Sequence, residues 1–250
     1  MKKALLMAAI FMTSHVQANP DLYVAFKVGT SVTKGKNASY TYDLNYIDYD
    51  SEYRSKLNFY DVNDSALPNV AVALGRGLEM RGKDNLRVEL EYAKKAKTEL
   101  NHKYGINVDT YYGVQEAYGF FDVDLETQTL FLNGYYDFDT NSKFTPYVGF
   151  GVGVSRIKHG LKYTDPYFMN VLMDKNDTTN NFVWNLGLGV AYKFSDLVTI
   201  DADYRYSDLG EIKDKYTIYN EYYGSSYIEK HGFKLNPVSH DFTVALRYKF

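Results

Sequence analysis

Cysteine is absent from this sequence of 250 residues, and tryptophan occurs once. The absence of cysteine excludes disulfides, thiolate metal sites and a cysteine nucleophile. Beyond the N-terminus, no apolar run approaches the roughly 18 residues that a membrane-spanning helix requires. Acidic and basic residues nearly balance at a formal net charge of −3, so the chain also lacks the positive charge expected of a nucleic-acid-binding protein.

The N-terminus has the organisation of a secretory signal. Two lysines after the first methionine precede the apolar segment 4–12, and residues 16–18 (VQA) form a small-residue cleavage site. We therefore expect residues 1–18 to be a signal peptide and residues 19–250 to form the mature domain. Removal of the two lysines leaves 26 basic and 31 acidic residues, a net charge of −5.

Apolar and polar residues alternate with a period of two along much of the sequence. In the C-terminal segment 238–250, Phe242, Val244 and Leu246 share one parity, and polar residues occupy the other. Side chains alternate between the two faces of a strand, so this segment predicts a strand with one apolar face. The same pattern marks seven more strands, over residues 21–33, 68–78, 86–98, 123–138, 144–158, 181–194 and 198–208.

The connections between these eight segments alternate between long and short, beginning with a long one. Short periplasmic turns and long extracellular loops are typical of bacterial outer-membrane barrels. A soluble lipocalin-like barrel has the same number of strands but would enclose its apolar face. The aromatic strand ends and the long apolar rows favour the membrane barrel. The predicted fold is therefore all-β: an eight-stranded antiparallel transmembrane β-barrel with short periplasmic turns and four long extracellular loops.

The polar faces of these strands carry charges that would point into the lumen. They are Lys27, Arg87, Glu89, Glu91, Asp201, Asp203, Arg205, Arg247 and Lys249. An eight-stranded barrel is only wide enough for its own side chains, and unpaired charges there are costly. Two interpretations remain: a polar lining that conducts ions, and a salt-bridge network across the lumen that closes it. The second is favoured.

Four stretches resemble the opacity-type surface proteins of Gram-negative bacteria, which include the opacity family porins and related small barrel antigens. They are residues 133–138 (NGYYDF), 144–153 (FTPYVGFGVG), 203–206 with 209–210 (DYRY and LG), and 240–250 (HDFTVALRYKF). The resemblance implies an eight-stranded barrel that is inserted by an assembly machinery reading a C-terminal aromatic, here Tyr248 and Phe250. It also implies exposure at the cell surface and, often, adhesion to host molecules. The resemblance fades in the long connections, so no receptor follows from it.

Tyrosine is in excess, at 26 of 250 residues. Many tyrosines lie in the long connections, and the candidates for recognition are Tyr46, Tyr49, Tyr53, Tyr111, Tyr112, Tyr219, Tyr222 and Tyr223. Tyrosine among serine, glycine and asparagine makes rigid amphipathic contacts, as in antibody paratopes. The alternative is that strands extend beyond the membrane and tyrosine simply suits exposed hairpins. Both can hold.

Patterns that suggest enzymes are weak in this sequence. The glycines of segment 149–153 are followed by a strand, whereas a phosphate loop requires a helix, so we expect them to keep the lumen wall thin. Segment 239–241 (SHD) has the residue types of a catalytic triad, but neighbours on a strand point to opposite faces. Four more residues of suitable type could meet at the outer rim: His159, His231, Ser226 and Glu229. No catalytic, cofactor-binding or metal site is predicted.

The sequence thus predicts an exported, monomeric outer-membrane barrel without enzymatic activity or cofactor. Its extracellular loops would act in surface recognition, adhesion or antigenic display. A narrow porin that passes ions or small solutes is the alternative. The expected partners are outer-membrane lipid and lipopolysaccharide, the barrel assembly machinery and a host-cell or matrix ligand, but not nucleic acid.

Overall fold

The computed structural model of the chain describes residues 22–46, 51–59, 66–80, 83–110, 113–164, 171–222 and 225–250, and the expected signal peptide lies outside this part. Within it, no helix is long and apolar enough to cross a membrane. The described residues form eleven strands: β1 (Leu22–Tyr46), β2 (Ser51–Phe59), β3 (Ala66–Met80), β4 (Lys83–Lys95), β5 (Thr98–Thr110), β6 (Gly113–Asp137), β7 (Phe144–Thr164), β8 (Val171–Lys193), β9 (Val198–Asp208), β10 (Ile212–Tyr222) and β11 (Ser225–Lys249).

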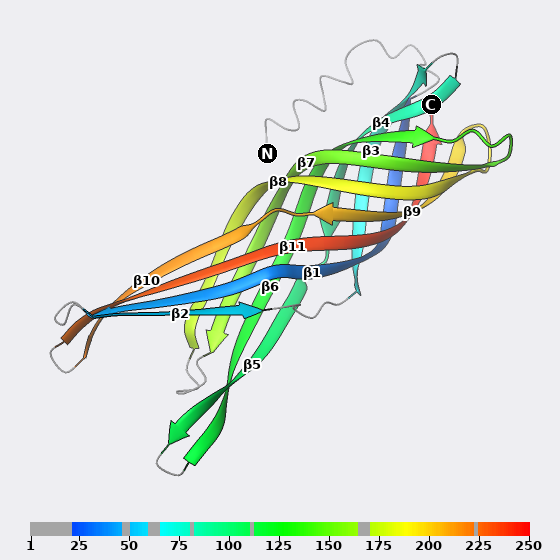
Figure 1. Cartoon of the computed structure of the whole chain (residues 1–250). Coiled ribbons are helices and arrows are strands. Elements are labelled where there is room, and N and C mark those ends of the chain that lie inside the picture. Colours follow the sequence, from blue (N-terminus) through cyan, green and yellow to red (C-terminus); the bar gives the residue numbers. More distant parts are fainter. Residues whose placement is uncertain are drawn as a thin grey trace.

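Eight of these strands close into a ring (Figure 1). Each pairs antiparallel with the next in the order β1, β3, β4, β6, β7, β8, β9 and β11, and β11 pairs back to β1. The short connections lie together at one end, where the Lys193 amide donates to Lys143 O at 2.9 Å and the Lys249 amide donates to Leu197 O at 2.8 Å. The eight-stranded antiparallel barrel expected from the sequence is confirmed.

The strands of the ring are staggered, which tilts them relative to the barrel axis. Paired residues lead from Val28 through β3, β4, β6 and β7 to Asn180 on β8. In the other direction, through β11 and β9, they lead to Val190, ten positions away on the same strand. Strands in such barrels tilt by about 35–45°, and eight of them leave an interior just wide enough for side chains. The walls must therefore fill the lumen.

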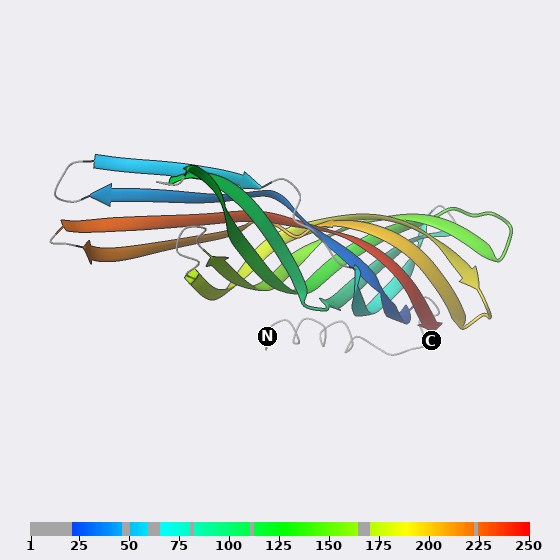
Figure 2. The ribbon, with the colours of Figure 1, turned by 90° about the horizontal axis from the view of Figure 1, so that it is seen from below.

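The remaining strands continue the wall beyond the ring. β2 pairs with β1, β5 with β6, and β10 with β11, so three long hairpins extend from the end opposite the short connections (Figure 2). Much of what the sequence suggests as long loops is therefore strand. β1 runs to Tyr46 instead of ending near Thr33, and β11 begins at Ser225 instead of Val238.

Extra residues interrupt the wall where the hairpins begin. The β1–β11 register shifts between Lys36 and Ser39. Three residues of the β4–β5 break face two residues of β6. The β1 break contains Asn37 and the β9–β10 break contains Gly210, with φ of 51° and 80°. An extra residue bends the strand and moves every following side chain to the other face, so these bulges change which residues point inward.

Above the breaks, the ring opens into two four-stranded sheets. One has the order β10-β11-β1-β2 and the other β5-β6-β7-β8; within the described residues, no ladder joins β2 to β5 or β10 to β8. The two sheets contribute to one buried apolar cluster, which we call the extracellular core: Ala38, Tyr40, Leu100, Phe121, Val123, Leu125, Ile157, Leu161, Leu209, Ile212, Phe233 and Leu235. The chain therefore has a small sandwich-like core above a barrel with a polar interior.

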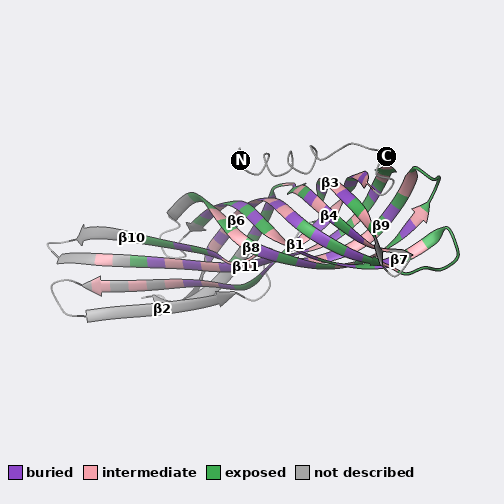
Figure 3. Ribbon diagram, turned by 90° about the horizontal axis from the view of Figure 1, so that it is seen from above, coloured by how far each residue is buried: buried purple, intermediate pink, exposed green. Residues whose placement is uncertain are grey.

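Buried and exposed residues alternate along the strands of the wall (Figure 3), but the side of the wall that is apolar inverts at this level. On β7, Val154 points outward and is 55% exposed, whereas Ile157 and Leu161 point inward and are at most 1% exposed. On β6, Leu125 belongs to the extracellular core and Phe131 faces the lumen. Both are large apolar side chains on the inner face, and for that reason they blur the alternation in the sequence.

Below the inversion, the outer surface is an apolar belt. Every strand of the ring contributes large apolar side chains that are exposed by more than a third; they include Phe26, Val70, Val72, Val88, Leu132, Val148, Phe150, Leu186, Leu188, Ile200, Val244 and Leu246. Phe144, Phe194 and Phe250 are exposed at the end with the short connections. A belt of this kind, bordered by aromatic side chains, is the surface that hydrocarbon covers in transmembrane barrels.

Candidate functional site: the closed lumen and the extracellular core

Four buried charged side chains meet in the middle of the lumen: Lys27 of β1, Glu89 and Glu91 of β4, and Arg205 of β9. Lys27 Nζ donates to Glu89 and to Glu91 Oε2, the latter at 2.5 Å. Arg205 donates to Glu91 through both terminal nitrogens, with Nη2 at 3.1 Å from Oε2. Since β4 and β9 are four strands apart in either direction round the ring, the Arg205–Glu91 pair crosses the lumen.

Two further ion pairs lie nearer the end with the short connections. Arg87 donates to Asp137 from Nε at 2.7 Å and from Nη2 at 2.9 Å. Arg247 donates to Asp201 in the same way, at 2.6 and 2.8 Å. Both pairs join neighbouring strands and have the two-pronged geometry that is strongest for arginine and carboxylate. Arg247 therefore stabilises the wall between β9 and β11 and does not cross the lumen.

A further ion pair closes the lumen toward the extracellular end. Lys95 Nζ at the end of β4 donates to Asp241 on β11, three strands away, and to Ser31 Oγ at 3.0 Å. Ser239 Oγ donates to the other oxygen of Asp241 at 3.4 Å. All four side chains are buried.

Tyrosine rings fill the lumen where glycines leave room. Three tyrosines stand opposite a glycine on the next strand: Tyr23 opposite Gly75, Tyr135 opposite Gly149, and Tyr147 opposite Gly189. A Cβ atom on any of these glycines would lie 2.2–2.5 Å from the facing ring. Tyr135 and Tyr147 meet edge to face at 5.6 Å, and the Arg87 guanidinium lies 4.7 and 4.8 Å from their centroids. The thin wall expected at residues 149–153 thus accommodates an aromatic ring.

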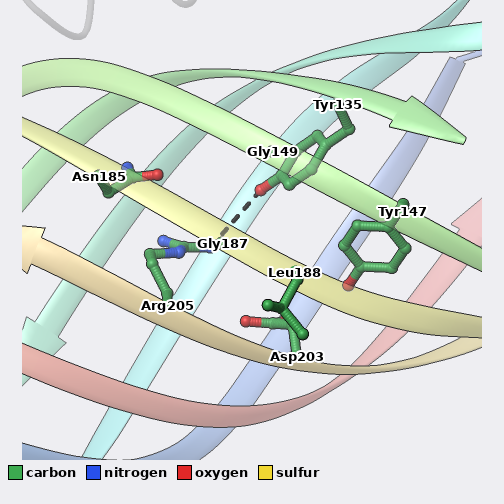
Figure 4. A pocket seen from close by; sticks show the side chains of 8 residues that line it. All are labelled: Tyr135, Tyr147, Gly149, Asn185, Gly187, Leu188, Asp203 and Arg205. Atoms are coloured by element: carbon green, nitrogen blue, oxygen red, sulfur yellow. Dashed lines mark hydrogen bonds between the residues drawn. The ribbon is translucent and has the colours of Figure 1, made fainter.

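Little space remains between these side chains (Figure 4). A cavity of about 10 Å³, room for about one water molecule, is lined by Tyr135, Tyr147, Gly149, Asn185, Gly187, Leu188, Asp203 and Arg205. Arg205 Nη2 donates to the Tyr135 hydroxyl across it at 3.5 Å.

The extracellular core closes the barrel a second time. Tyr40 of one sheet packs against Phe121 of the other, with ring centroids 5.0 Å apart. His159 Nε2 and Asp214 Oδ2 lie 2.8 Å apart and also join the two sheets, and His231 bonds the Tyr40 hydroxyl. The sequence suggested that both histidines lie at the outer rim, but that is wrong: they are at most 3% exposed, because the strands continue past them.

Comparison with known proteins is consistent with this geometry. The model of the family described as outer membrane protein beta-barrel domain matches residues 4–250. The chain belongs to this family. It is a protein of the outer membrane, as the sequence predicts.

Two curated relatives are similar to parts of this outer-membrane barrel. Outer membrane protein PagN of Salmonella typhimurium is 31% identical over 122 residues, which are 49% of each chain. Opacity protein opA60 of Neisseria gonorrhoeae is 25% identical over 158 residues, 51% of this chain and 66% of that one. The barrel therefore spans about half to two thirds of the length of these relatives. The resemblance to opacity-type proteins is confirmed.

Solved structures with a similar fold include two outer-membrane barrels. Neisserial surface protein A superposes with a TM-score of 0.46 at 14% identity, over 92% of this chain and 97% of that one. OprG from Pseudomonas aeruginosa gives 0.49 at 14% identity, over 94% and 100%.

The structure places all nine charged residues expected in the lumen of this outer-membrane barrel on the inner face. Lys249 is the last residue of β11, opposite Tyr23 at the lumen mouth, and Asp203 lines the cavity. The sequence reasoning missed Lys95, Asp137 and Asp241. Lys95 shares the parity of Glu91, so continuing the alternation to the end of the strand would have found it.

The tyrosines predicted to act in recognition have side chains outside the described part of the chain. Tyr46, Tyr53, Tyr219 and Tyr222 belong to β1, β2 and β10 by their backbone, with Tyr46 opposite Tyr227 and Tyr219 opposite Ile228. Their side chains lie outside the described part of the chain, as do residues Tyr49, Tyr111, Tyr112 and Tyr223. Their part in recognition stays a prediction.

The triad-like residues do not converge. Ser239 and Asp241 face the lumen, whereas His240 faces outward and bonds the Tyr204 hydroxyl at 2.7 Å. The side chains of Ser226 and Glu229 lie outside the described part. Among the described residues, no group of three or more histidine, aspartate or glutamate side chains could hold a metal ion.

The aromatic C-terminus lies on the outer face. Tyr248 and Phe250 are 45% and 57% exposed, and their rings meet edge to face at 5.7 Å. Their role as an assembly signal stays a prediction.

Proposed function

We propose that this barrel acts in surface recognition, adhesion or antigenic display through its extracellular hairpins. The observation that carries the proposal is the closure of the lumen by the Arg205–Glu91 pair across its middle. The extracellular core and the Lys95–Asp241 pair add closure above it. A barrel filled in this way offers its extracellular strands and connections, and not its interior, as the working surface.

The extracellular core suits a recognition role. It holds β1, β6, β7, β10 and β11 together above the membrane, so the hairpin ends project from a packed base. Binding costs less free energy when the contact surface is already ordered. The long connections and hairpin ends are rich in tyrosine, a residue that gives large contacts at low entropic cost. A host-cell or matrix molecule is the class of partner that we propose, and we propose no enzymatic reaction.

Shortened hairpins test this function while leaving the extracellular core in place. Asp43 is paired with Arg54, so residues 44–53 can be removed and the two joined by an Asn-Gly turn. Thr217 is paired with Lys230, so residues 218–229 can be removed in the same way. We expect each shortened barrel to fold, as measured by heat-modifiable gel migration, and the variant lacking both hairpins to lose binding of barrel-expressing cells to host cells or matrix.

The matched control alters the opposite end. Asn141 has φ of 51° in a short connection, a conformation that glycine adopts without strain, so Asn141→Gly should leave folding and binding unchanged. Full binding by the folded barrel with both hairpins shortened would refute a role of the β1–β2 and β10–β11 hairpins in recognition.

The narrow porin is the second candidate, because the lumen is polar. Conductance of the refolded barrel in a planar bilayer distinguishes the two. We expect no discrete current steps. Reproducible steps whose ion selectivity changes in Arg205→Met would mean that the pair opens, and would favour the porin.

A further inference from the structure

One row of side chains borders the apolar belt on four neighbouring strands and carries no carboxylate. Lys94 of β4 is opposite Gln128 of β6, Gln128 is opposite Arg156 of β7, and Arg156 is opposite Asn180 of β8. These residues have the outward parity, and all except the half-buried Gln128 are exposed. We call them the donor row. Directly opposite side chains on paired strands have Cβ atoms about 5 Å apart, so neighbours in the row can contact the same small anion.

The residues next to the donor row show where it lies. The outward row on its membrane side is apolar: Tyr92, Leu130, Val154 and Phe182. Three of these are 45–70% exposed and belong to the belt. The next outward row on its other side is polar and contains Glu126 and Lys158. The donor row therefore marks the edge of the membrane-embedded surface on this side of the barrel.

The two cations of the donor row, Lys94 and Arg156, differ in their ion pairing from the lysines on its extracellular side. Lys158 Nζ lies 3.9 Å from Glu126, and Lys97 Nζ lies 2.9 Å from Asp124. Within the described part of the chain, Lys94 and Arg156 have no ion-pair partner. Two uncompensated cations with an amide between them form a positive site at the boundary between apolar and polar surface.

We propose that the donor row binds the phosphate groups of a phosphorylated glycolipid in the outer leaflet. Arginine presents a planar fork that matches phosphate, lysine contributes a second positive charge, and the amides of Gln128 and Asn180 can donate to sugar or phosphate oxygens. The apolar row directly below is continuous with the belt and would contact the acyl chains of the same molecule. This continuity is the reason for assigning the site to a lipid and not to a free anion.

Energy transfer from the single tryptophan tests the proposal. Trp184 is on the outward side of β8, next to β7, and no other tryptophan contributes to the signal. The refolded barrel is placed in phosphatidylcholine vesicles that contain lipid A labelled with a fluorescent acceptor, and the association is titrated. A cation at the membrane surface changes lipid association by about fivefold, so we expect Lys94→Gln and Arg156→Gln each to weaken it by about that factor. Labelled lipid A without phosphates should bind wild type and the double variant equally.

Lys158→Gln is the matched control, since it removes an outward lysine from β7 that already has a carboxylate partner. It should bind labelled lipid A as wild type does. Heat-modifiable migration confirms that every variant is folded. Three results would overturn the proposal: equal lipid A association for wild type and the double variant, an undiminished signal from the lipid without phosphates, or release of lipid A by inorganic phosphate at matched ionic strength.

Discussion

Replacement of Glu91 by glutamine tests whether buried charge pairing holds the lumen closed. The Glu91 side chain is 1% exposed and accepts hydrogen bonds from Lys27 and from Arg205 on the opposite wall. Lys27 keeps Glu89 as a partner in the variant, whereas Arg205 loses its carboxylate. Glutamine preserves the shape of the side chain, so the change isolates the charge.

The expected magnitude follows from the burial of the partner left behind. The Arg205 side chain is 9% exposed, and removal of one member of a buried ion pair costs about 3–5 kcal/mol because the other charge stays uncompensated. We expect Glu91→Gln to lower the free energy of unfolding by about that amount. Adding Arg205→Met removes the orphaned charge, so the double variant should be more stable than the sum of the two single changes predicts, by at least about 1 kcal/mol.

Urea titration of the refolded barrel in lipid vesicles measures these differences, with Trp184 fluorescence and gel migration as the two signals. Asp196→Asn is the control, because its pair with Lys193 is exposed and should contribute nothing measurable. The reasoning would be refuted by a Glu91→Gln barrel within about 1 kcal/mol of wild type, or by effects in the double variant that simply add.

Two further substitutions test the filled lumen and the extracellular core in the same urea assay. Gly149→Ala places a methyl group 2.5 Å from the Tyr135 ring and should destabilise the barrel by about 1–3 kcal/mol. Gly134→Ala is the control, because its methyl group would lie 4.0 Å from the nearest atom and should not destabilise the barrel. Equal effects of the two substitutions would contradict the packing of the Tyr135 ring against Gly149. Leu125 lies in the extracellular core, outside the apolar belt, and its side chain is 1% exposed. Leu125→Ala leaves a cavity there and should lower the free energy of unfolding by about 2–5 kcal/mol. An unchanged free energy of unfolding would mean that the extracellular core does not contribute to stability.

The sequence could predict the wall of the ring because the constraint on it is local. Each strand between hydrocarbon and a polar lumen must alternate, so the parity of Phe242 and Leu246 identifies the outward face without knowledge of any neighbour. The same parity places Lys27, Glu89 and Arg205 inside. The number of strands and the short connections follow from counting these segments.

The partners inside the ring could not be predicted in this way. Glu91 and Arg205 are 114 positions apart in sequence, and their meeting depends on the closure of the ring and on its stagger. Arg247 has the same parity and charge as Arg205 but pairs with the neighbouring strand. Parity gives the face of a side chain, whereas its height in the lumen is set by the register of all eight strands.

By itself, the sequence determined that this chain is an outer-membrane barrel of eight strands with a charged interior. The reason is that the alternation of apolar and polar residues along each strand is a local property of the sequence. Only the tertiary structure decided what happens beyond the membrane. There the wall divides into two sheets, and the bulges at Asn37 and Gly210 shift the parity of β1 and β10, so that Tyr40 and Ile212 point inward and join Leu125 and Ile157 in an apolar core. A bulge adds one residue with no strong sequence signal, yet it reverses the face of every residue after it, so the second core appears only when the paired strands are seen together.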